Sequence, residues 1–381
     1  MKTAWKIAII VTALGLILIT IAVFTGASRL VYWDTNGPHV INSDYENEKR
    51  ITELDLEPFE NIEIRADFLD VETITSDRYG IDVCYFEGDL TWSLNKGNLI
   101  IDFKPKKNIH FFNFSFGSVE LQNYIKVYLP KDAELGTFFA KTDMGKIEAG
   151  EIRANEVQII NSFGDLDIYS ITCNRLQIEM DAGGFSAKNL SVTGDIKYKN
   201  NFGASRFETV SATNFVLNSD AGEVSVNGCS AQSIDAKSGF GSSRFDNTNA
   251  NSFVLNSDAG EVTINGCQAK SIEIKSNFGR INAKNLVSAK TDIKSDAGEI
   301  DVAGEFLGQT VIKSEFGNIS FATEKAKEDY TYDIYAGFGS VTLDNNFDNN
   351  RVRNSAYGGN SAENSLSITS SAGDIQIYFT K

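Results

Sequence analysis

Apolar residues recur along this chain with a period of two inside short segments, and the segments recur with a period close to 19 residues. Relative to one glycine in each repeat, apolar side chains stand seven and five positions before it and two and four positions after it. In the repeat around Gly222 they are Phe215, Leu217, Val224 and Val226. A period of two is typical of a strand with one buried face, so each repeat predicts two short strands joined by turns.

The glycine that fixes this frame is called the pivot glycine. It recurs at intervals of 19, with one of 20, at Gly145, Gly164, Gly183, Gly203, Gly222, Gly241, Gly260, Gly279, Gly298 and Gly317. Such a period is typical of a solenoid, in which each turn of chain buries its apolar face against the next. We therefore expect an all-β, single-stranded parallel β-helix of about 19 residues per rung, right-handed by the usual chirality of parallel crossovers. An open sheet of flat hairpin repeats is the alternative.

Two further columns follow the same register. The residue before the pivot alternates between large and small, in the order Met144, Phe163, Ala182, Phe202, Ala221, Phe240, Ala259, Phe278, Ala297 and Phe316. We expect this column to be interior, with each ring filling the space above an alanine. Three positions before the pivot stand Ser219, Ser238, Ser257, Ser276, Ser295 and Ser314. A nucleophile needs a base in one rung only, so six copies favour a structural role. The pivot glycine itself is expected to need a positive φ.

The first 30 residues form a separate unit. Lys2 and Lys6 precede an uncharged apolar run of 18 residues at 7–24, and Arg29 follows it. That length is sufficient to cross a bilayer, and the basic N-terminus predicts that this end stays in the cytoplasm. We expect residues 1–30 to be a cytoplasmic stub and transmembrane signal anchor, which places a single-pass protein in the cell membrane with most of the chain extracellular. A cleaved signal peptide is the alternative.

Charge and cysteines narrow the possible partners. The 51 acidic residues exceed the 35 basic ones, giving a net charge of −16, which opposes nucleic-acid binding. Cys229 and Cys267 both stand seven positions after a pivot glycine, two rungs apart. Two rungs span roughly 10 Å, too far for a disulfide. We therefore expect core cysteines and no disulfide, with Cys84 and Cys173 unpaired too.

The remaining segments bound the regular rungs. We expect a juxtamembrane spacer at 31–50, irregular N-terminal rungs and a cap at 51–133, regular rungs at 134–323, and irregular C-terminal rungs and a cap at 324–381. Caps are needed because a bare solenoid end is an exposed strand edge. The segment SSAGDIQIYF at 370–379 predicts the last rung.

Carboxylates are the only repeated polar constellation. An aspartate two positions before alternate pivots and a glutamate one position after them give Asp220, Glu223, Asp258, Glu261, Asp296 and Glu299 as weak Ca²⁺ candidates. Aspartate is also common in turns, so we assign no metal, no cofactor and no catalytic residue. A polysaccharide lyase or hydrolase with paired carboxylates is the enzyme alternative. A catalytic site should break a repeat, whereas these acids follow it.

Three stretches carry a resemblance to a known family: FENIEIRADFLDVETITS at 59–76, YIKVYLPKDAELGTFFAKTDMGKIEA at 124–149, and the serial SDAGE and FG turns. Over residues 51–381 the chain resembles the DUF4097-type adhesins, β-strand repeat proteins of bacterial surfaces. The resemblance implies a membrane-anchored or secreted β-helix, an association of some members with envelope-stress operons, and no catalytic residue to carry over. No LPxTG motif is present, so the N-terminal helix would be the anchor.

These features predict a non-catalytic, adhesin-like ectodomain whose lateral faces bind a cell-envelope glycan or a surface protein, since a long repetitive surface suits multivalent attachment. Capture of cationic peptides by the acidic turns is one alternative, and it should fail in moderate salt because exposed charges are screened. A structural spacer that binds no surface component is another.

Overall fold

The computed structural model describes residues 30–34, 37–41, 48–86, 88–105, 110–111, 123–348, 350–353 and 363–379. The apolar run at 7–24, predicted to be the anchor, lies outside these ranges. Within them, no helix has the length and apolar character to cross a membrane.

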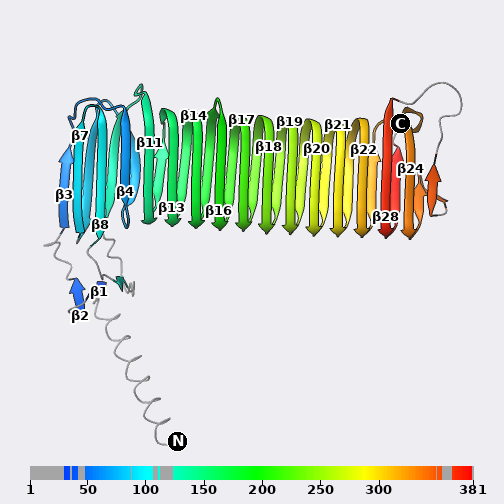
Figure 1. The fold of residues 1–381 in the computed structure, drawn as a ribbon, viewed down its shortest axis with the longest axis horizontal. Coiled ribbons are helices and arrows are strands. Elements are labelled where there is room, and N and C mark those ends of the chain that lie inside the picture. Colours follow the sequence, from blue (N-terminus) through cyan, green and yellow to red (C-terminus); the bar gives the residue numbers. More distant parts are fainter. Residues whose placement is uncertain are drawn as a thin grey trace, which may run out of the picture.

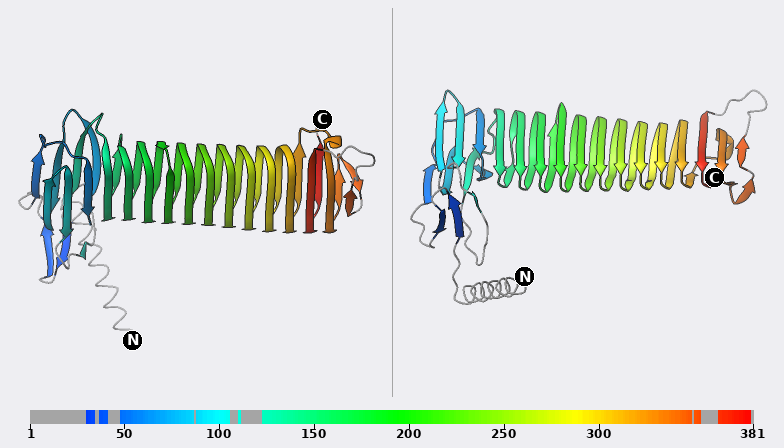
Figure 2. Two further views of the ribbon diagram at one scale, coloured as in Figure 1. Left: turned by 45° about the horizontal axis from the view of Figure 1, so that its top comes forward. Right: turned by 60° about the horizontal axis from the view of Figure 1, so that its bottom comes forward.

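The molecule is a rod of stacked rungs (Figures 1 and 2). In its middle each rung is one long bent strand of 17 residues: β17 (Ser205–Ala221), β18 (Val224–Phe240), β19 (Ser243–Ala259), β20 (Val262–Phe278), β21 (Ile281–Ala297) and β22 (Ile300–Phe316). Neighbouring rungs pair parallel and in register; Val224 lies opposite Ser243, for example. The predicted all-β parallel solenoid is confirmed, and parallel pairing of whole rungs is not what flat hairpin repeats would give.

The preceding rungs have the same register but are divided into shorter strands: β11 (Leu135–Met144), β12 (Ile147–Gly150), β13 (Arg153–Phe163), β14 (Leu166–Ala182), β15 (Phe185–Val192) and β16 (Asp195–Phe202). The breaks fall at the corners of the rung, so the stack itself is continuous. β14 pairs with both β15 and β16, which together make the next rung.

The core is the set of columns that the hydrophobic pattern predicts. Phe215, Leu217, Val224 and Val226 are buried, as are their equivalents in the other regular rungs. Rings in adjacent columns meet edge to face, with the Phe207 and Phe215 centroids 5.1 Å apart. All four cysteines are buried and free, as predicted.

A second corner lies six residues after the pivot, where the period of two predicts no change of direction. The residue there has a positive φ of 51° to 72° although it is mostly not glycine: Glu151, Ser170, Asn189, Thr209, Gly228, Asn247, Gly266 and Asn285. The left-handed conformation is cheapest for Gly and Asn, which hold four of the last five of these positions after Thr209 with Asn247, Gly228, Gly266 and Asn285. This corner turns the strand without interrupting its pairing.

At the N-terminal end, antiparallel strands join the stack. The elements are β1 (Leu30–Asp34), β2 (Gly37–Ile41), β3 (Glu48–Glu53), β4 (Asn61–Ala66), β5 (Asp70–Ser76), β6 (Gly80–Phe86), β7 (Gly88–Asn95), β8 (Asn98–Pro105), β9 (His110–Phe111) and β10 (Tyr124–Pro130). β4 and β5 continue the rungs in parallel, whereas β7 pairs antiparallel with β8, and β3 with β6. Reversed strands therefore cover this edge.

The C-terminal end departs from the predicted order. Its elements are β23 (Ile319–Thr323), the 3₁₀ turn η1 (Lys327–Asp329), β24 (Tyr330–Phe338), β25 (Val341–Leu343), β26 (Asn346–Asp348), β27 (Arg351–Arg353), β28 (Asn364–Ala372) and β29 (Ile375–Phe379). β28 pairs with β22 on one side and β24 on the other, and β29 lies between β23 and β25 (Figure 1). The prediction that 370–379 forms the last rung is wrong. That segment is inserted before the last rung, whose outer edge pairs antiparallel with β26 and β27.

Candidate binding surfaces on the rod

The pivot glycines are structural. From Gly164 to Gly317 their φ values lie between +125° and +149°, which confirms the predicted positive φ. A Cβ on Gly241 would lie 2.1 Å from the carbonyl oxygen of Gly222, and every other regular pivot has a comparable contact. The corner therefore excludes any side chain, and this column is not a ligand site.

The serine column serves the same corner. At equivalent positions the Asn161 amide donates to the Gly145 carbonyl at 3.1 Å, and the Ser370 hydroxyl donates to the Gly317 carbonyl at 3.1 Å. The six serines between them are buried beside the same carbonyl column, and their hydroxyls have no hydrogen-bond partner within the described chain. Hydroxyls repeated at each corner carbonyl fit the structural role predicted for them.

The six candidate acids lie on the surface along one edge of the rod, and all are exposed. Asp258 accepts a hydrogen bond from the Asn277 amide of the next rung at 3.0 Å, and Glu299 lies 3.6 Å from the Arg280 guanidinium. No group of three or more His, Cys, Asp or Glu side chains in the described ranges is placed to hold a metal ion. The acids form an acidic edge that is denser on every second rung.

The alternating column before the pivot lies on the surface, and the prediction that it is interior is wrong. The exposed fraction is 57% for Phe163 and reaches 87% for Phe338. The alternation of buried and exposed positions holds as far as the buried serine three positions before the pivot. It then fails because the chain turns at the glycine, so the residue that parity would place inside points outward.

The column is named the aromatic stripe. It consists of Phe163, Phe202, Phe240, Phe278, Phe316 and Phe338, separated by Ala182, Ala221, Ala259, Ala297 and Ala372. Each is the last residue of its strand, and the arrowheads of these strands line one long edge of the rod in Figure 1. At the C-terminal end Ala372 pairs with Phe316 on one side and Phe338 on the other. The alternation thus follows the order of rungs in space, even where the order along the sequence is exchanged.

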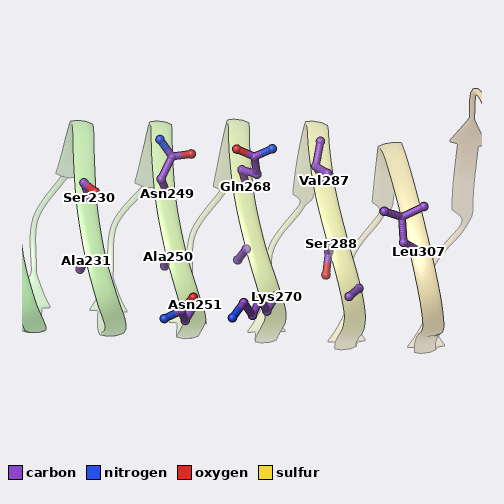
Figure 3. A pocket seen from close by; sticks show the side chains of 12 residues that line it. Ser230, Ala231, Asn249, Ala250, Asn251, Gln268, Lys270, Val287, Ser288 and Leu307 are labelled. Carbon is purple, nitrogen blue, oxygen red and sulfur yellow. The ribbon is translucent and has the colours of Figure 1, made fainter.

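A shallow groove of about 430 Å³ crosses the rungs of β18 to β22 on another side of the rod. Its floor is a column of small residues nine positions after the pivot, including Ala231, Ala250 and Ala269. Figure 3 shows the Asn249 and Gln268 amides along one side of this floor. Asn251 and Lys270 lie along the other side, and Leu307 stands at the end (Figure 3). The alanines at a fixed offset are the sequence signal for this groove.

The groove is chemically neutral apart from Lys270. Its walls offer amide and hydroxyl groups, which both donate and accept hydrogen bonds, and its floor is flat enough for an extended polymer to lie along the rungs. The four cysteines do not contribute to any surface. Burial raises the pKa of Cys229 and Cys267 to about 12, so both remain neutral thiols.

The family model described as Toastrack DUF4097 matches this chain twice, at residues 51–239 and 211–378. No curated protein matches it. Among solved structures, a "putative cell adhesion protein" of Clostridium sporogenes is 11% identical and aligns over 87% of this chain and 99% of its own, with a TM-score of 0.18. A "putative adhesin" of Bacteroides fragilis is 12% identical over 87% of this chain and 97% of its own, with a TM-score of 0.26. With TM-scores this low, these structures do not bear on what the chain does.

Proposed function

Since the chain belongs to the Toastrack DUF4097 family, we propose that it is a non-catalytic, adhesin-like rod whose lateral groove binds a cell-envelope glycan. The observation that carries this proposal is the groove itself, with an alanine floor and amide walls repeated across successive rungs. Neutral donors and acceptors suit sugar hydroxyls, which offer the same two functions.

The repeat of the groove along the rod suits a repeating ligand. Each rung adds one more set of side chains about 4.8 Å further along the axis. A polymer that contacts several rungs gains avidity from each contact, although one contact alone is weak. A shallow surface can therefore hold a long glycan.

The proposal also places the rod outside the cell. Lys2, Lys6 and the apolar run at 7–24 would anchor the N-terminus in the membrane. The rod begins soon after this segment, so its lateral faces would be presented to the envelope rather than to the cytoplasm.

Retention of the purified full-length chain, kept in detergent, on insoluble cell-wall glycan tests the groove. We expect retention at low and at moderate salt, because the contacts are neutral hydrogen bonds. Ala250→Trp should abolish retention by filling the floor. Ala212→Trp, in the same column but outside the groove, is the matched control and should bind like the unchanged chain.

Two results would contradict the proposal. Retention that disappears in moderate salt would assign binding to the acidic edge and to cationic ligands. Failure to bind at either salt would leave the rod as a spacer or as the partner of another membrane protein.

A further inference from the structure

We propose that the aromatic stripe is a self-association surface on which two copies of this chain pack antiparallel, each inserting its phenylalanine rings into the alanine gaps of the other. Six rings exposed by 57% to 87% form a continuous apolar line on an otherwise acidic protein. Apolar patches of this size on soluble surfaces mark interaction sites. Groove binding does not use this face.

The spacing of the stripe fits rings of its own kind. Successive phenylalanines lie two rungs apart, which is roughly 9.6 Å. A ring placed over the intervening alanine would lie about 4.8 Å from each neighbour, within the range of about 4.5–7 Å for favourable aromatic pairs. The alanines, being small, leave that space open.

Symmetry decides the direction of the second copy. A two-fold axis along the rod places each rung opposite itself, so ring would meet ring. A two-fold axis across the rod reverses one copy, and a dyad between the rungs of Ala259 and Phe278 places rings over gaps throughout. In this register Phe278 of each copy covers Ala259 of the other, and Phe338 covers Ala182. A closed pair must therefore be antiparallel.

The charges agree with this register. The acidic rungs are the alanine rungs, with Asp258 and Glu261 beside Ala259, whereas the phenylalanine rungs mostly carry neutral neighbours such as Asn277 beside Phe278. Reversal brings Asp258 opposite Asn277 of the second copy. Arg280 comes opposite Glu261 of the second copy, twice across the dyad.

Two of the acids do meet in this register, since Asp220 comes opposite Glu315 of the second copy. The phenylalanine–alanine alternation otherwise keeps the carboxylates of the two copies on different rungs.

The area is sufficient for a stable pair. An aromatic side chain presents about 150–250 Å², so the exposed parts of five inserted rings amount to roughly 700 Å² per copy. A standard protein interface buries about 800 Å² per partner. The alanines and the flanking residues supply the remainder.

This inference extends the proposed function. If the N-termini are anchored, antiparallel rods have their anchors at opposite ends, so the pair would join two facing membranes. That consequence rests on the anchor, but self-association does not, and glycan retention can fail without affecting it.

Sedimentation velocity of the full-length chain in detergent tests self-association. We expect a monomer–dimer equilibrium that strengthens with salt, because both copies carry a net charge of −16. Ala259→Phe adds apolar surface but fills the gap on the dyad, and should weaken association by roughly tenfold or more. Phe240→Ala combined with Phe278→Ala should do the same. Leu307→Ala removes an exposed apolar side chain elsewhere and should have no effect.

A dimer that survives both stripe variants is held by another part of the chain, and a chain that stays monomeric at all concentrations has no self-association surface. Either result overturns the proposal. Binding of a cationic peptide to the monomer, lost with salt and on removal of the rings, would assign the stripe to such peptides instead.

Discussion

At the scale of residues, the two kinds of corner in each rung use glycine differently. At the pivot the approach of the neighbouring carbonyl leaves no room for any Cβ. At the second corner the backbone is also left-handed, but space is open and Asn247 and Asn285 occupy it. Two glycines with positive φ therefore have opposite tolerance to substitution.

Gly241→Ala should destabilise the rod by more than the about 1–3 kcal/mol of backbone strain alone, because its Cβ would lie 2.1 Å from a carbonyl oxygen. Gly266→Asn, at the second corner, should change the free energy of unfolding by little. Chemical denaturation of both variants checks this pair. Equal destabilisation would show that φ alone, and not the carbonyl contact, selects glycine at the pivot.

The core thiols should make the rod sensitive to alkaline pH. Burial raises the pKa of Cys229 and Cys267 from an ordinary value near 9.0 to about 12. Their contribution to stability is complete below the ordinary value and is lost as the pH rises toward the folded value, because only the unfolded chain ionises. Replacing both by Val, the residue at the equivalent position Val210, should flatten the fall in unfolding free energy over this range. An unchanged slope would contradict it.

At the scale of elements, Asp82 ties three strands of the N-terminal end together. Its carboxylate accepts hydrogen bonds from Arg50 at 3.0 and 2.7 Å, from Thr52 at 2.7 Å and from Tyr124 at 3.0 Å. These groups come from β3 and β10, which flank β6. Burial acts to raise the pKa of Asp82, but the hydrogen bonds outweigh it and hold the pKa below its usual range.

Asp82→Asn should loosen β3 against β6 while leaving the middle rungs intact, since one acceptor oxygen and the negative charge are lost. Amide hydrogen exchange resolved by segment measures this. In the unchanged chain, protection of β3 is expected above the ordinary pKa of aspartate and to fall as the pH drops through the lowered value. The variant should lack that pH dependence, and loss of protection in β18 to β21 would contradict a local role.

How far the sequence predicts these elements depends on which force sets the position. Phe215 and Leu217 were predictable as core because strand parity and burial agree there. Phe240 was not, because the pivot turn reverses the parity that holds up to Ser238. The groove required knowing that Ala231 and Ala250 stack on an outer face, and the second corner gave only the weak signal of Gly and Asn at Gly228 and Asn247.

At the scale of the whole molecule, the rod behaves as a one-dimensional array in which each rung contacts only its neighbours. The repeat that preserves both the core and the aromatic stripe is two rungs, or 38 residues, for example 222–259. Length and stability should therefore change in units of this size.

Deletion of residues 222–259 should give a folded, shorter rod, because Ala221 is then followed by Gly260 as it was by Gly222. Circular dichroism should show unchanged strand signal per residue, and the denaturant m-value should fall in proportion to length. Deletion of 222–250, which is not a whole number of rungs, is the control and should fail to fold. A folded product from both would show that register is not enforced.

The exchange of strands at the C-terminal end has a consequence for how the protein is made. β24 and β25 leave the ribosome before β28 and β29, yet the later pair lies between them and the finished rungs. Chains fold from the N-terminus as they are synthesised, so the stack can grow to β23 but cannot be completed in order. The outermost rung has its neighbour only after the final residues arrive. A chain cut short before residue 364 would keep an open edge at its tip, so the last strands act as a check that synthesis has finished.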